Sequence, residues 1–314
     1  MRKLALIALG GTALAVACVA GDKVVSSTLH EHAAAPANSN FNDPDRVDLI
    51  GSADLVVDRP ATEQHWVVRD ENLPAEFCSV QEGGVTPGLR RVIRFTVTTP
   101  NIGDADVYVG DPLKHMDPNG DGDFSDQDGM FEFASCHNHF HFQNYAVYRL
   151  IERLPDGSDG RVWRSAKKGF CMLDTDPNPT STYSREQPAG DRNYYSCGTL
   201  TRSGFQGVSH GWADTYVWFL AGQYFVLDGG DGQDPVPPGQ YFIEVTVNPG
   251  YAPRKGKGCP LVTDSRGLCH NFAESNYDNN TMRTVVSIPA HPGREGAGPL
   301  KGAKHYDYEV MKGQ

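Results

Sequence analysis

Hydrophobic and polar side chains alternate with a period of two in several segments of the chain. Ile93, Phe95 and Val97 are apolar, and the residues between them are polar. The same alternation runs through residues 241–247, directly after a Pro-Pro-Gly turn at 237–239. A period of two is typical of a strand with one buried face, and a Pro-Gly turn often precedes a strand. No stretch longer than two helical turns has a convincing period of 3.6 residues.

The body of the chain, residues 46–288, is therefore predicted to be one all-β, sandwich-like domain with long loops and little helix. The 34 glycines and 21 prolines among 314 residues favour turns over a helical bundle, and a hydrophobic fraction of 39% is enough for a core. Residues 21–45, rich in Ala, Pro, Ser and Asn, are predicted to be a disordered linker. Residues 289–314, rich in Gly and Pro, are predicted to be a flexible C-terminal tail.

The first twenty residues have the pattern of an export signal. Arg2 and Lys3 precede an uncharged, largely apolar stretch at 4–19, and Ala20 before Gly21 offers a small-residue cleavage site. A membrane anchor is the weaker interpretation, because the stretch is short for a spanning helix. Cys18 leaves lipidation open as an alternative. We expect a secreted, periplasmic or cell-surface protein without a transmembrane segment.

Charge and cysteine content narrow the class of protein further. A net charge of −11 without a run of Lys or Arg argues against a nucleic-acid partner. Beyond Cys18, an even number of cysteines in an oxidising compartment predicts up to three disulfides, with fifteen possible pairings. These cysteines are Cys78, Cys136, Cys171, Cys197, Cys259 and Cys269. None forms a Cys-X-X-Cys pair, which argues against a zinc–thiolate site.

Three histidines occupy alternate positions in one short segment. The side-chain period of a strand places His137, His139 and His141 on the same face. Imidazole suits copper, zinc, nickel and iron, with the highest affinity for Cu(II), and a three-ligand site keeps positions open for catalysis. At this level the metal stays open, because zinc with an activated water would give a hydrolase. The non-functional alternative is a polar strand face that carries three surface histidines.

An acidic, glycine-rich segment has the spacing of a calcium-binding loop. Its candidate ligands are Asp117, Asn119, Asp121 and Asp123, with Ser125 at position nine and Asp128 at position twelve. The loop departs from the usual pattern in having Asp rather than Glu at position twelve and no flanking helices. The alternative is an acidic surface loop.

The segment Cys136-His137-Asn138-His139-Phe140-His141 resembles the Cys-His-X-His-Tyr/Phe-His copper motif of the lysyl oxidase family. Other segments resemble further family motifs in the same order: Asp54-Leu55-Val56-Val57-Asp58, Lys167-Lys168-Gly169-Phe170-Cys171-Met172, Gly211-Trp212-Ala213-Asp214-Thr215-Tyr216, Pro238-Gly239-Gln240-Tyr241 through Val247-Asn248-Pro249, and Glu274-Ser275-Asn276-Tyr277-Asp278-Asn279-Asn280. The resemblance covers roughly residues 48–288, and several ordered motifs are more specific than one. It implies the catalytic-domain fold of that family, with the three histidines as copper ligands.

The resemblance also implies roles for three other residues. Lys167 and Tyr216 match the pair that cross-links into lysine tyrosylquinone, the organic cofactor of the family. Lys168 is the rival lysine, but only Lys167 has the four-residue offset of the family to the following cysteine. Asp214 stands where the family has its proposed catalytic base.

These matches imply a copper-dependent amine oxidase of the protein-lysine 6-oxidase type. Such an enzyme uses O₂ to convert primary amines, either peptidyl lysine or small amines, to aldehydes and releases H₂O₂ and ammonia. Two alternatives stay open. One is a three-histidine zinc hydrolase, which would not need Lys167 and Tyr216. The other is a non-catalytic, calcium-stabilised extracellular domain that binds copper.

Disulfides and a second calcium site complete what the resemblance implies. Cys136 and Cys197 match a family pair, whereas Cys259 and Cys269 lie close enough in an insertion for a local bridge, which leaves Cys78 with Cys171. Some family members bind calcium where the start of the domain meets the acidic loop. The matching ligands are Asp54, the carbonyl of Leu55, Glu274, Asn276, Asn279 and Asn280.

Overall fold

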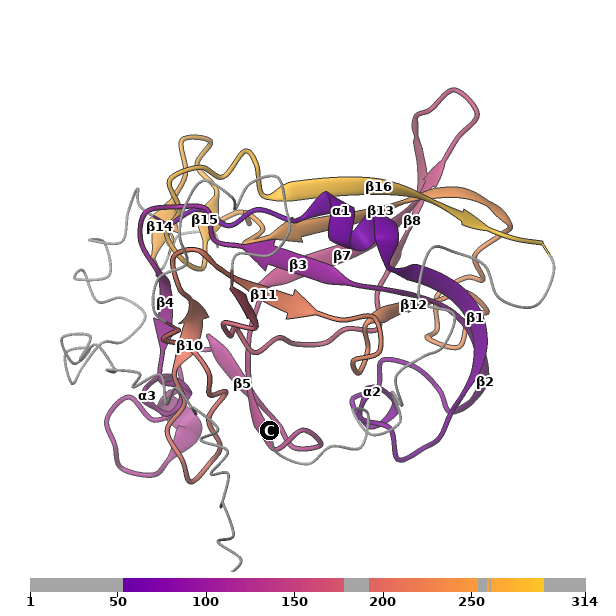
Figure 1. Cartoon of the computed structure of the whole chain (residues 1–314). Coiled ribbons are helices and arrows are strands. Elements are labelled where there is room, and N and C mark those ends of the chain that lie inside the picture. Colours follow the sequence, from indigo (N-terminus) through magenta and orange to yellow (C-terminus); the bar gives the residue numbers. More distant parts are fainter. Residues whose placement is uncertain (1–52, 178–191, 254–258, 260, 291–314) are drawn as a thin grey trace, which may run out of the picture.

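The computed structural model describes residues 53–177, 192–253, 259 and 261–290 (Figure 1). The predicted signal peptide at 1–20 with Cys18, the linker at 21–45 and most of the tail at 289–314 lie outside these residues. Among the described residues, no helix is both long and apolar enough to cross a membrane.

The largest sheet has four antiparallel strands in the order β16-β13-β7-β8. These strands are β7 (Ala146–Arg153), β8 (Asp159–Arg164), β13 (Gly239–Val247) and β16 (Thr281–Ile288). In β13, Tyr241, Ile243 and Val245 are buried, as the alternation of its sequence predicts, and the Pro-Pro-Gly turn comes directly before the strand. The strand β13 pairs with β7 on one side, where Tyr241 lies opposite Glu152. On the other side it pairs with β16, where Tyr241 lies opposite Val286.

Two three-stranded sheets lie beneath this layer in the view of Figure 1. One contains β1 (Trp66–Leu73), β2 (Gly88–Phe95) and β12 (Tyr224–Val226), and the other β3 (Val97–Pro100), β9 (Asp176–Pro177) and β11 (Trp212–Tyr216). The ring of Phe95 on β2 joins the layers, because it lies 5.2 Å from that of Tyr148 on β7, and within its own sheet it stacks on Phe225 of β12 at 5.1 Å. A large apolar core therefore lies between the sheets, and a smaller apolar cluster contains Leu73, Phe77 and Val92.

The remaining elements are short. Three two-stranded pairs are β4 (Val107–Gly110) with β10 (Gln206–Val208), β5 (Phe131–Ala134) with β6 (His139–Phe142), and β14 (Val262–Thr263) with β15 (Cys269–His270). The described helices are α1 (Arg59–Gln64), α2 (Cys78–Gln81), α3 (Pro112–Met116) and the 3₁₀ turn Phe124–Asp126. The prediction of an all-β fold with long loops and little helix is confirmed.

The alternation in sequence predicts that Arg94 on β2 faces solvent, but it does not. Arg94 is fully buried, and its guanidinium donates to both carboxylate oxygens of Glu71 and to the carbonyls of Trp218 and Leu220. Both faces of β2 are covered at this point, so a paired charge takes the place of a solvated one.

Two of the three predicted disulfides are wrong. The structure joins Cys78 to Cys136 and Cys171 to Cys197, with Cα atoms 5.5 Å and 5.6 Å apart, and not Cys136 to Cys197 or Cys78 to Cys171. The third pair, Cys259 with Cys269, agrees with the prediction. The pairing depends on which segments pack together in the folded protein. The helix α2, which contains Cys78, packs beside the turn that contains Cys136, and the segment after Cys171 lies beside the segment that contains Cys197. Gln206 joins these two segments by accepting from the Met172 amide and donating to the Cys197 carbonyl.

Candidate active site

The three histidines lie on one hairpin, but not all in one strand. In the β5–β6 ladder, Ala134 faces His139, and residues 135–138 form the turn. Asn138 has a φ of 55°, and its amide donates to the Ala134 carbonyl at 2.8 Å. An asparagine tolerates this left-handed conformation better than most residues. The expectation of one continuous strand is therefore corrected: His139 and His141 belong to β6, and His137 to the turn.

The hairpin nevertheless brings the three imidazole rings together. Ring centroids lie 5.3 Å apart for His137 and His139, 5.4 Å for His137 and His141, and 5.0 Å for His139 and His141. The turn bends the chain so that the ring of His137 lies beside the two that share a face of β6.

Burial favours the neutral form of two of these imidazoles. Desolvation, with smaller effects from His137 and Lys167, lowers the pKa of His139 to about 3. Burial and then the charge of Lys167 hold the pKa of His141 well below its usual value. A neutral imidazole is the form that binds a metal ion. The Nδ1 atom of His139 is buried and has no hydrogen-bond partner among the described residues.

The described ranges contain no group of three or more His, Cys, Asp or Glu side chains already arranged to hold a metal ion. The donor set still fits copper in its chemistry, because it offers three clustered imidazoles, two of them held neutral and one with an unpartnered buried nitrogen.

Neighbouring segments hold the hairpin in place. The Phe142 amide donates to the Phe170 carbonyl at 2.6 Å, and the side chain of Gln206 donates to the Phe140 carbonyl at 3.0 Å. Gly169 lies against His141 so closely that a Cβ atom there would be 2.6 Å from the Cβ and Cγ atoms of the histidine. Only glycine permits this approach without a shift of His141.

Lys167 and Tyr216 face each other at the same site. The ammonium nitrogen of Lys167 lies 5.1 Å from the ring centroid of Tyr216 and 3.4 Å from the Ala221 carbonyl. Tyr216, on β11, is buried and donates its hydroxyl hydrogen bond to the Cys171 carbonyl at 2.6 Å. Lys168 is exposed to solvent. Lys167, which has the four-residue offset of the family to the following cysteine, is thus the lysine beside Tyr216.

Asp214 lies two residues before Tyr216 on β11, opposite Thr99 of β3. Its side chain is buried, and its Oδ2 atom has no hydrogen-bond partner among the described residues. Burial raises the pKa of this carboxyl well above its usual value. A carboxyl with a raised pKa in a cavity wall is typical of an acid–base group.

These residues line one cavity of about 230 Å³. Its walls are formed by His137, His139, His141, Lys167, Cys171, Leu173, Thr175, Cys197, Asp214, Thr215, Tyr216, Val217, Leu220 and Ala221. The structure thus brings together all six residues expected at the copper and quinone centre, from β6, β11, the β5–β6 turn and the loop after β8.

Comparison with known proteins agrees with this arrangement. Residues 58–254 match the sequence profile described as Lysyl oxidase, which is more than half of the chain. The chain belongs to the lysyl oxidase family. All six residues of the cavity that match the family motifs lie inside the matched region.

Curated relatives of the lysyl oxidase family are similar over most of the chain. Lysyl oxidase homolog 3A of Danio rerio is 24% identical over 251 residues, which are 76% of this chain and 26% of the relative. Lysyl oxidase homolog 2 of Gallus gallus is 26% identical over 73% of this chain and 24% of the relative. Protein-lysine 6-oxidase of Rattus norvegicus is 28% identical over 51% of this chain and 29% of the relative. The chain spans about a quarter of the length of these relatives.

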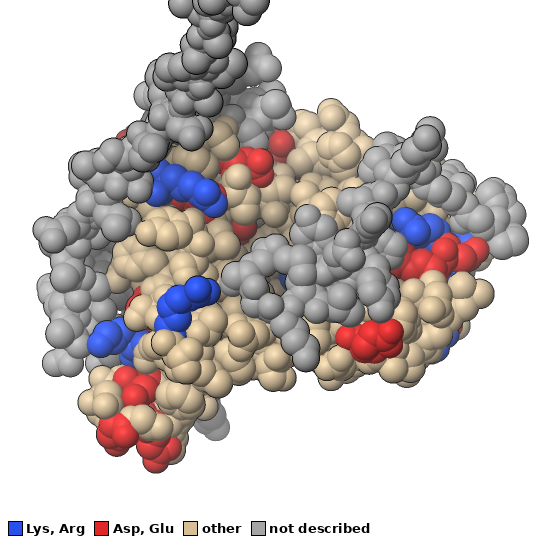
Figure 2. All heavy atoms as spheres, turned by 60° about the horizontal axis from the view of Figure 1, so that its bottom comes forward, with Lys and Arg blue, Asp and Glu red and all other residues tan. Residues whose placement is uncertain are grey.

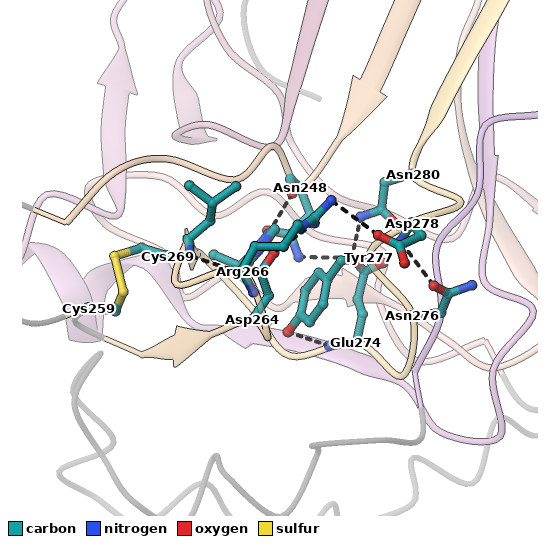
Figure 3. Close-up of polar contacts among 12 residues, drawn as sticks. Asn248, Cys259, Asp264, Arg266, Cys269, Glu274, Asn276, Tyr277, Asp278 and Asn280 are labelled. Carbon is teal, nitrogen blue, oxygen red and sulfur yellow. Dashed lines mark hydrogen bonds and ion pairs between the residues drawn. A yellow bond between two sulfur atoms is a disulfide. The ribbon is translucent and has the colours of Figure 1, made fainter.

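Some of the calcium ligands expected from the family resemblance lie close together, among them Glu274, Asn276 and Asn280 (Figure 3). Glu274 is buried and accepts hydrogen bonds from the Leu55 amide at 2.7 Å and the Asn280 side chain at 2.6 Å. The Asn279 side chain donates to both oxygens of Asp54. Asn276 accepts instead from the Asp278 amide.

Two side-chain amide oxygen atoms of this cluster are available to bind a cation. The Oδ1 atoms of Asn279 and Asn280 are buried without a hydrogen-bond partner among the described residues. Burial raises the pKa of Glu274 to about 8 and also raises that of Asp54. Carboxylate and amide oxygens are the donors that calcium prefers. The cluster therefore fits a hard cation.

The second calcium candidate is a surface loop next to α3. The carboxylate of Asp117 accepts from the amides of Asp121 and Gly122, and those of Asp121 and Asp123 each accept from an amide two residues on. Asp128 is turned toward His115, with Oδ2 2.7 Å from its Nδ1 atom, and accepts from the Met130 amide. Calcium binding by Asp117, Asn119, Asp121, Asp123 and Asp128 stays a prediction.

Three residues beside the cavity escaped the sequence analysis. Gly169 and Gln206 hold the histidine hairpin, as described above, and Glu82 lies with its Oε1 atom 3.1 Å from Nε2 of His137. Glu82 directly follows α2, which carries Cys78. Knowledge of the Cys78–Cys136 disulfide would have indicated that Glu82 lies near the histidines, but the sequence does not specify this pairing.

Proposed function

We propose that this protein is a copper-dependent amine oxidase that converts primary amines, either peptidyl lysine or small amines, to aldehydes. Its organic cofactor is lysine tyrosylquinone made from Lys167 and Tyr216. The observation that carries the proposal is the 5.1 Å approach of the Lys167 ammonium to the Tyr216 ring in the wall of the cavity that the three histidines also line. This proximity favours the cross-link over a zinc hydrolase, which has no use for the pair.

His137, His139 and His141 would hold the copper from one hairpin, and burial favours the neutral form of His139 and His141. Copper bound there would supply the activation of O₂ that oxidation of the Tyr216 ring needs. The β11 backbone and the hydrogen bond to the Cys171 carbonyl position that ring. Lys167 presents its amine to the face of the Tyr216 ring, with its nitrogen 5.1 Å from the ring centroid.

Formation of the cross-link needs molecular oxygen as its only oxidant. One O₂ converts the Tyr216 phenol to an ortho-quinone and one water. The Lys167 amine then adds to the ring through a new C–N bond, and a second O₂ reoxidises the product and leaves as H₂O₂. The net change consumes two O₂ and yields the cross-linked quinone, H₂O and H₂O₂.

During turnover, Asp214 takes the proton that leaves the α-carbon of the substrate amine. Its Oδ2 atom is available for this transfer, and its raised pKa makes it a stronger base than an exposed carboxylate. The overall reaction is RCH₂NH₂ + O₂ + H₂O → RCHO + NH₃ + H₂O₂. Leu173, Val217 and Leu220 give the cavity aliphatic walls, which suit the methylene chain of an alkyl amine.

We extend the proposal to calcium and to location. Calcium at Asp54, Leu55, Glu274, Asn276, Asn279 and Asn280 would join the start of the described domain to the loop before β16, which lies at its other end in sequence. The six cysteines beyond Cys18 form three disulfides, which supports a protein exported to an oxidising compartment. Peptidyl lysine and small amines outside the cytoplasm are then both candidate substrates.

The proposal is tested by loading the full chain with copper in air and measuring peroxide release from alkyl amines together with visible quinone absorbance. We expect both signals in the wild type and neither in His139→Ala or Tyr216→Phe. Hydrolytic activity with stoichiometric zinc and no quinone band would instead support the hydrolase. Copper binding with neither activity would support the non-catalytic alternative.

A further inference from the structure

A carboxylate that does not belong to the histidine hairpin reaches the histidine cluster. Glu82 caps the C-terminus of α2, and its amide donates to the Cys78 carbonyl. Its Oε1 atom lies 3.1 Å from Nε2 of His137. In Figure 1, α2 and the β5–β6 hairpin lie at the same end of the molecule.

The position of Glu82 is set by covalent and steric constraints on both sides. The Cys78–Cys136 disulfide joins α2 to the residue directly before His137. On the other side, Gly84 lies so close to the loop before Lys167 that a Cβ atom there would be 2.8 Å from the Ala166 carbonyl oxygen. The α2 segment is thus packed between the β5–β6 turn and the loop that contains Lys167. These contacts fix the position of Glu82 beside His137.

The contact with His137 lacks the alignment of a hydrogen bond. The Oε1 atom of Glu82 is buried, yet it has no hydrogen-bond partner among the described residues in spite of the 3.1 Å separation from Nε2. Leaving a carboxylate oxygen buried without a hydrogen bond is costly. A third atom that both Oε1 and Nε2 can contact would remove this cost.

The separation of the two atoms fits two ligands of one metal ion. Nitrogen and carboxylate oxygen ligands each lie about 2.0–2.2 Å from a first-row metal such as zinc, so neighbouring ligands on one ion are roughly 3 Å apart. The observed 3.1 Å fits this spacing, as it also fits a direct histidine–carboxylate ion pair. Glu82 also supplies a negative charge and a hard oxygen donor, both of which favour Cu(II) over Cu(I).

We infer that Glu82 is a fourth protein ligand of the copper ion, which its carboxylate oxygen binds beside Nε2 of His137. The inference rests on the proposed function, because it presupposes copper at the three histidines. The site is then three imidazoles and one carboxylate, and the carboxylate neutralises one of the two positive charges of Cu(II). The Cys78–Cys136 disulfide positions this ligand.

The test compares Cu(II) binding and the electron paramagnetic resonance spectrum of the full chain with those of Glu82→Gln. The matched control is Glu132→Gln, because Glu132 is an exposed carboxylate on β5 opposite His141 in the same hairpin. We expect Glu82→Gln to raise the Kd for Cu(II) at least tenfold, since loss of a partner of a ligand already costs about 10–100-fold. We also expect altered g and hyperfine values in Glu82→Gln, and wild-type values in Glu132→Gln.

The outcomes separate the inference from the proposed function. A wild type that binds no copper would contradict the proposed function itself. A wild type that binds one copper, with an unchanged spectrum and Kd in Glu82→Gln, would overturn the inference alone. A lower melting temperature of the metal-free variant with an unchanged copper spectrum would show that Glu82 only pairs with His137, which also overturns it. If Glu82→Gln does not fold, a crystal structure of the copper-loaded wild type decides by whether Oε1 is within bonding distance of the metal.

Discussion

The ammonium nitrogen of Lys167 lies 5.1 Å from the centroid of the Tyr216 ring, although one residue belongs to the loop after β8 and the other to β11. Both segments meet Phe170, whose ring contacts Tyr216 edge-on at 5.1 Å and lies 5.5 Å from the Lys167 nitrogen. The pair therefore needs no large movement to form a covalent bond once the ring is oxidised.

We predict that copper-loaded, aerated protein contains one peptide that joins the Lys167 and Tyr216 segments, detectable by mass spectrometry. Tyr216→Phe should lose the cross-link, the quinone absorbance and amine oxidation together, because phenylalanine has no phenol to oxidise. Lys167→Arg should lose all three as well, while Lys168→Arg, at an exposed position, should keep them. An inactive Lys168→Arg with an active Lys167→Arg would show that the other lysine forms the cofactor.

We predict that Gly169→Ala weakens copper binding at least tenfold, because a Cβ atom there would displace the imidazole of His141. The measurement is competition with a copper chelator. Gly239→Ala is the control, since a Cβ at that position would meet the ring of Tyr241 at an ordinary contact distance of 3.6 Å. Equal affinities for the two variants would contradict the steric role of Gly169.

We predict different consequences for two disulfides. Replacing Cys78 and Cys136 by serine should lower the free energy of unfolding by about 2–5 kcal/mol and also weaken copper binding, since this bond holds α2 against the histidine turn. Replacing Cys259 and Cys269 should lower stability without changing copper affinity. Denaturant titration and copper competition measure the two effects, and non-reducing peptide mapping checks the pairing. A peptide that links Cys136 to Cys197 would refute the structure at this point.

We predict that amine oxidation rises with pH through a pKa well above that of an ordinary aspartate. Burial raises the pKa of Asp214, so the carboxylate that accepts the substrate proton is present only above that raised value, and activity is lost as pH falls through it. The measurement is kcat/KM for peroxide release against pH. Asp214→Asn should lower kcat by about 10²–10⁴-fold at every pH while keeping the quinone band. A variant that kept wild-type kcat would exclude Asp214 as the base.

We predict that excess calcium chelator lowers the melting temperature without removing copper, because oxygen and imidazole sites differ in their preferred metals. Glu274→Gln should melt at the same temperature with and without the chelator if the cluster in Figure 3 is the site. Asp121→Asn is the corresponding variant for the Asp117–Asp128 loop. An unchanged melting curve for the wild type, together with metal analysis that detects no calcium, would count against both sites.

The distribution of charge on the surface indicates the binding partner less clearly than the cavity does. On the face shown in Figure 2, Lys and Arg side chains form small separate groups rather than one continuous basic area. The cavity, by contrast, combines an unpartnered carboxylate oxygen, an amine and aliphatic walls. The cavity, and not the surface charge, therefore favours the proposed amine substrate.

The sequence by itself determined the fold class and the family, and it named the candidate residues of the centre. Alternation along β13 predicted a half-buried strand because side chains in a strand point to opposite faces, and this is a local property. The three histidines, Lys167, Asp214 and Tyr216 could be named because their spacing within short segments resembles that of a family.

Tertiary structure alone decided how these segments meet. The turn at Asn138, the disulfide from Cys78 to Cys136 and the burial of Arg94 against Glu71 each depend on which segments pack side by side. Cysteine order in the chain does not encode pairing, because a disulfide needs Cα atoms about 4.4–6.8 Å apart whatever their separation in sequence. For the same reason, the closeness of Glu82 to His137 follows from the packing of α2 and has no local signal in the sequence.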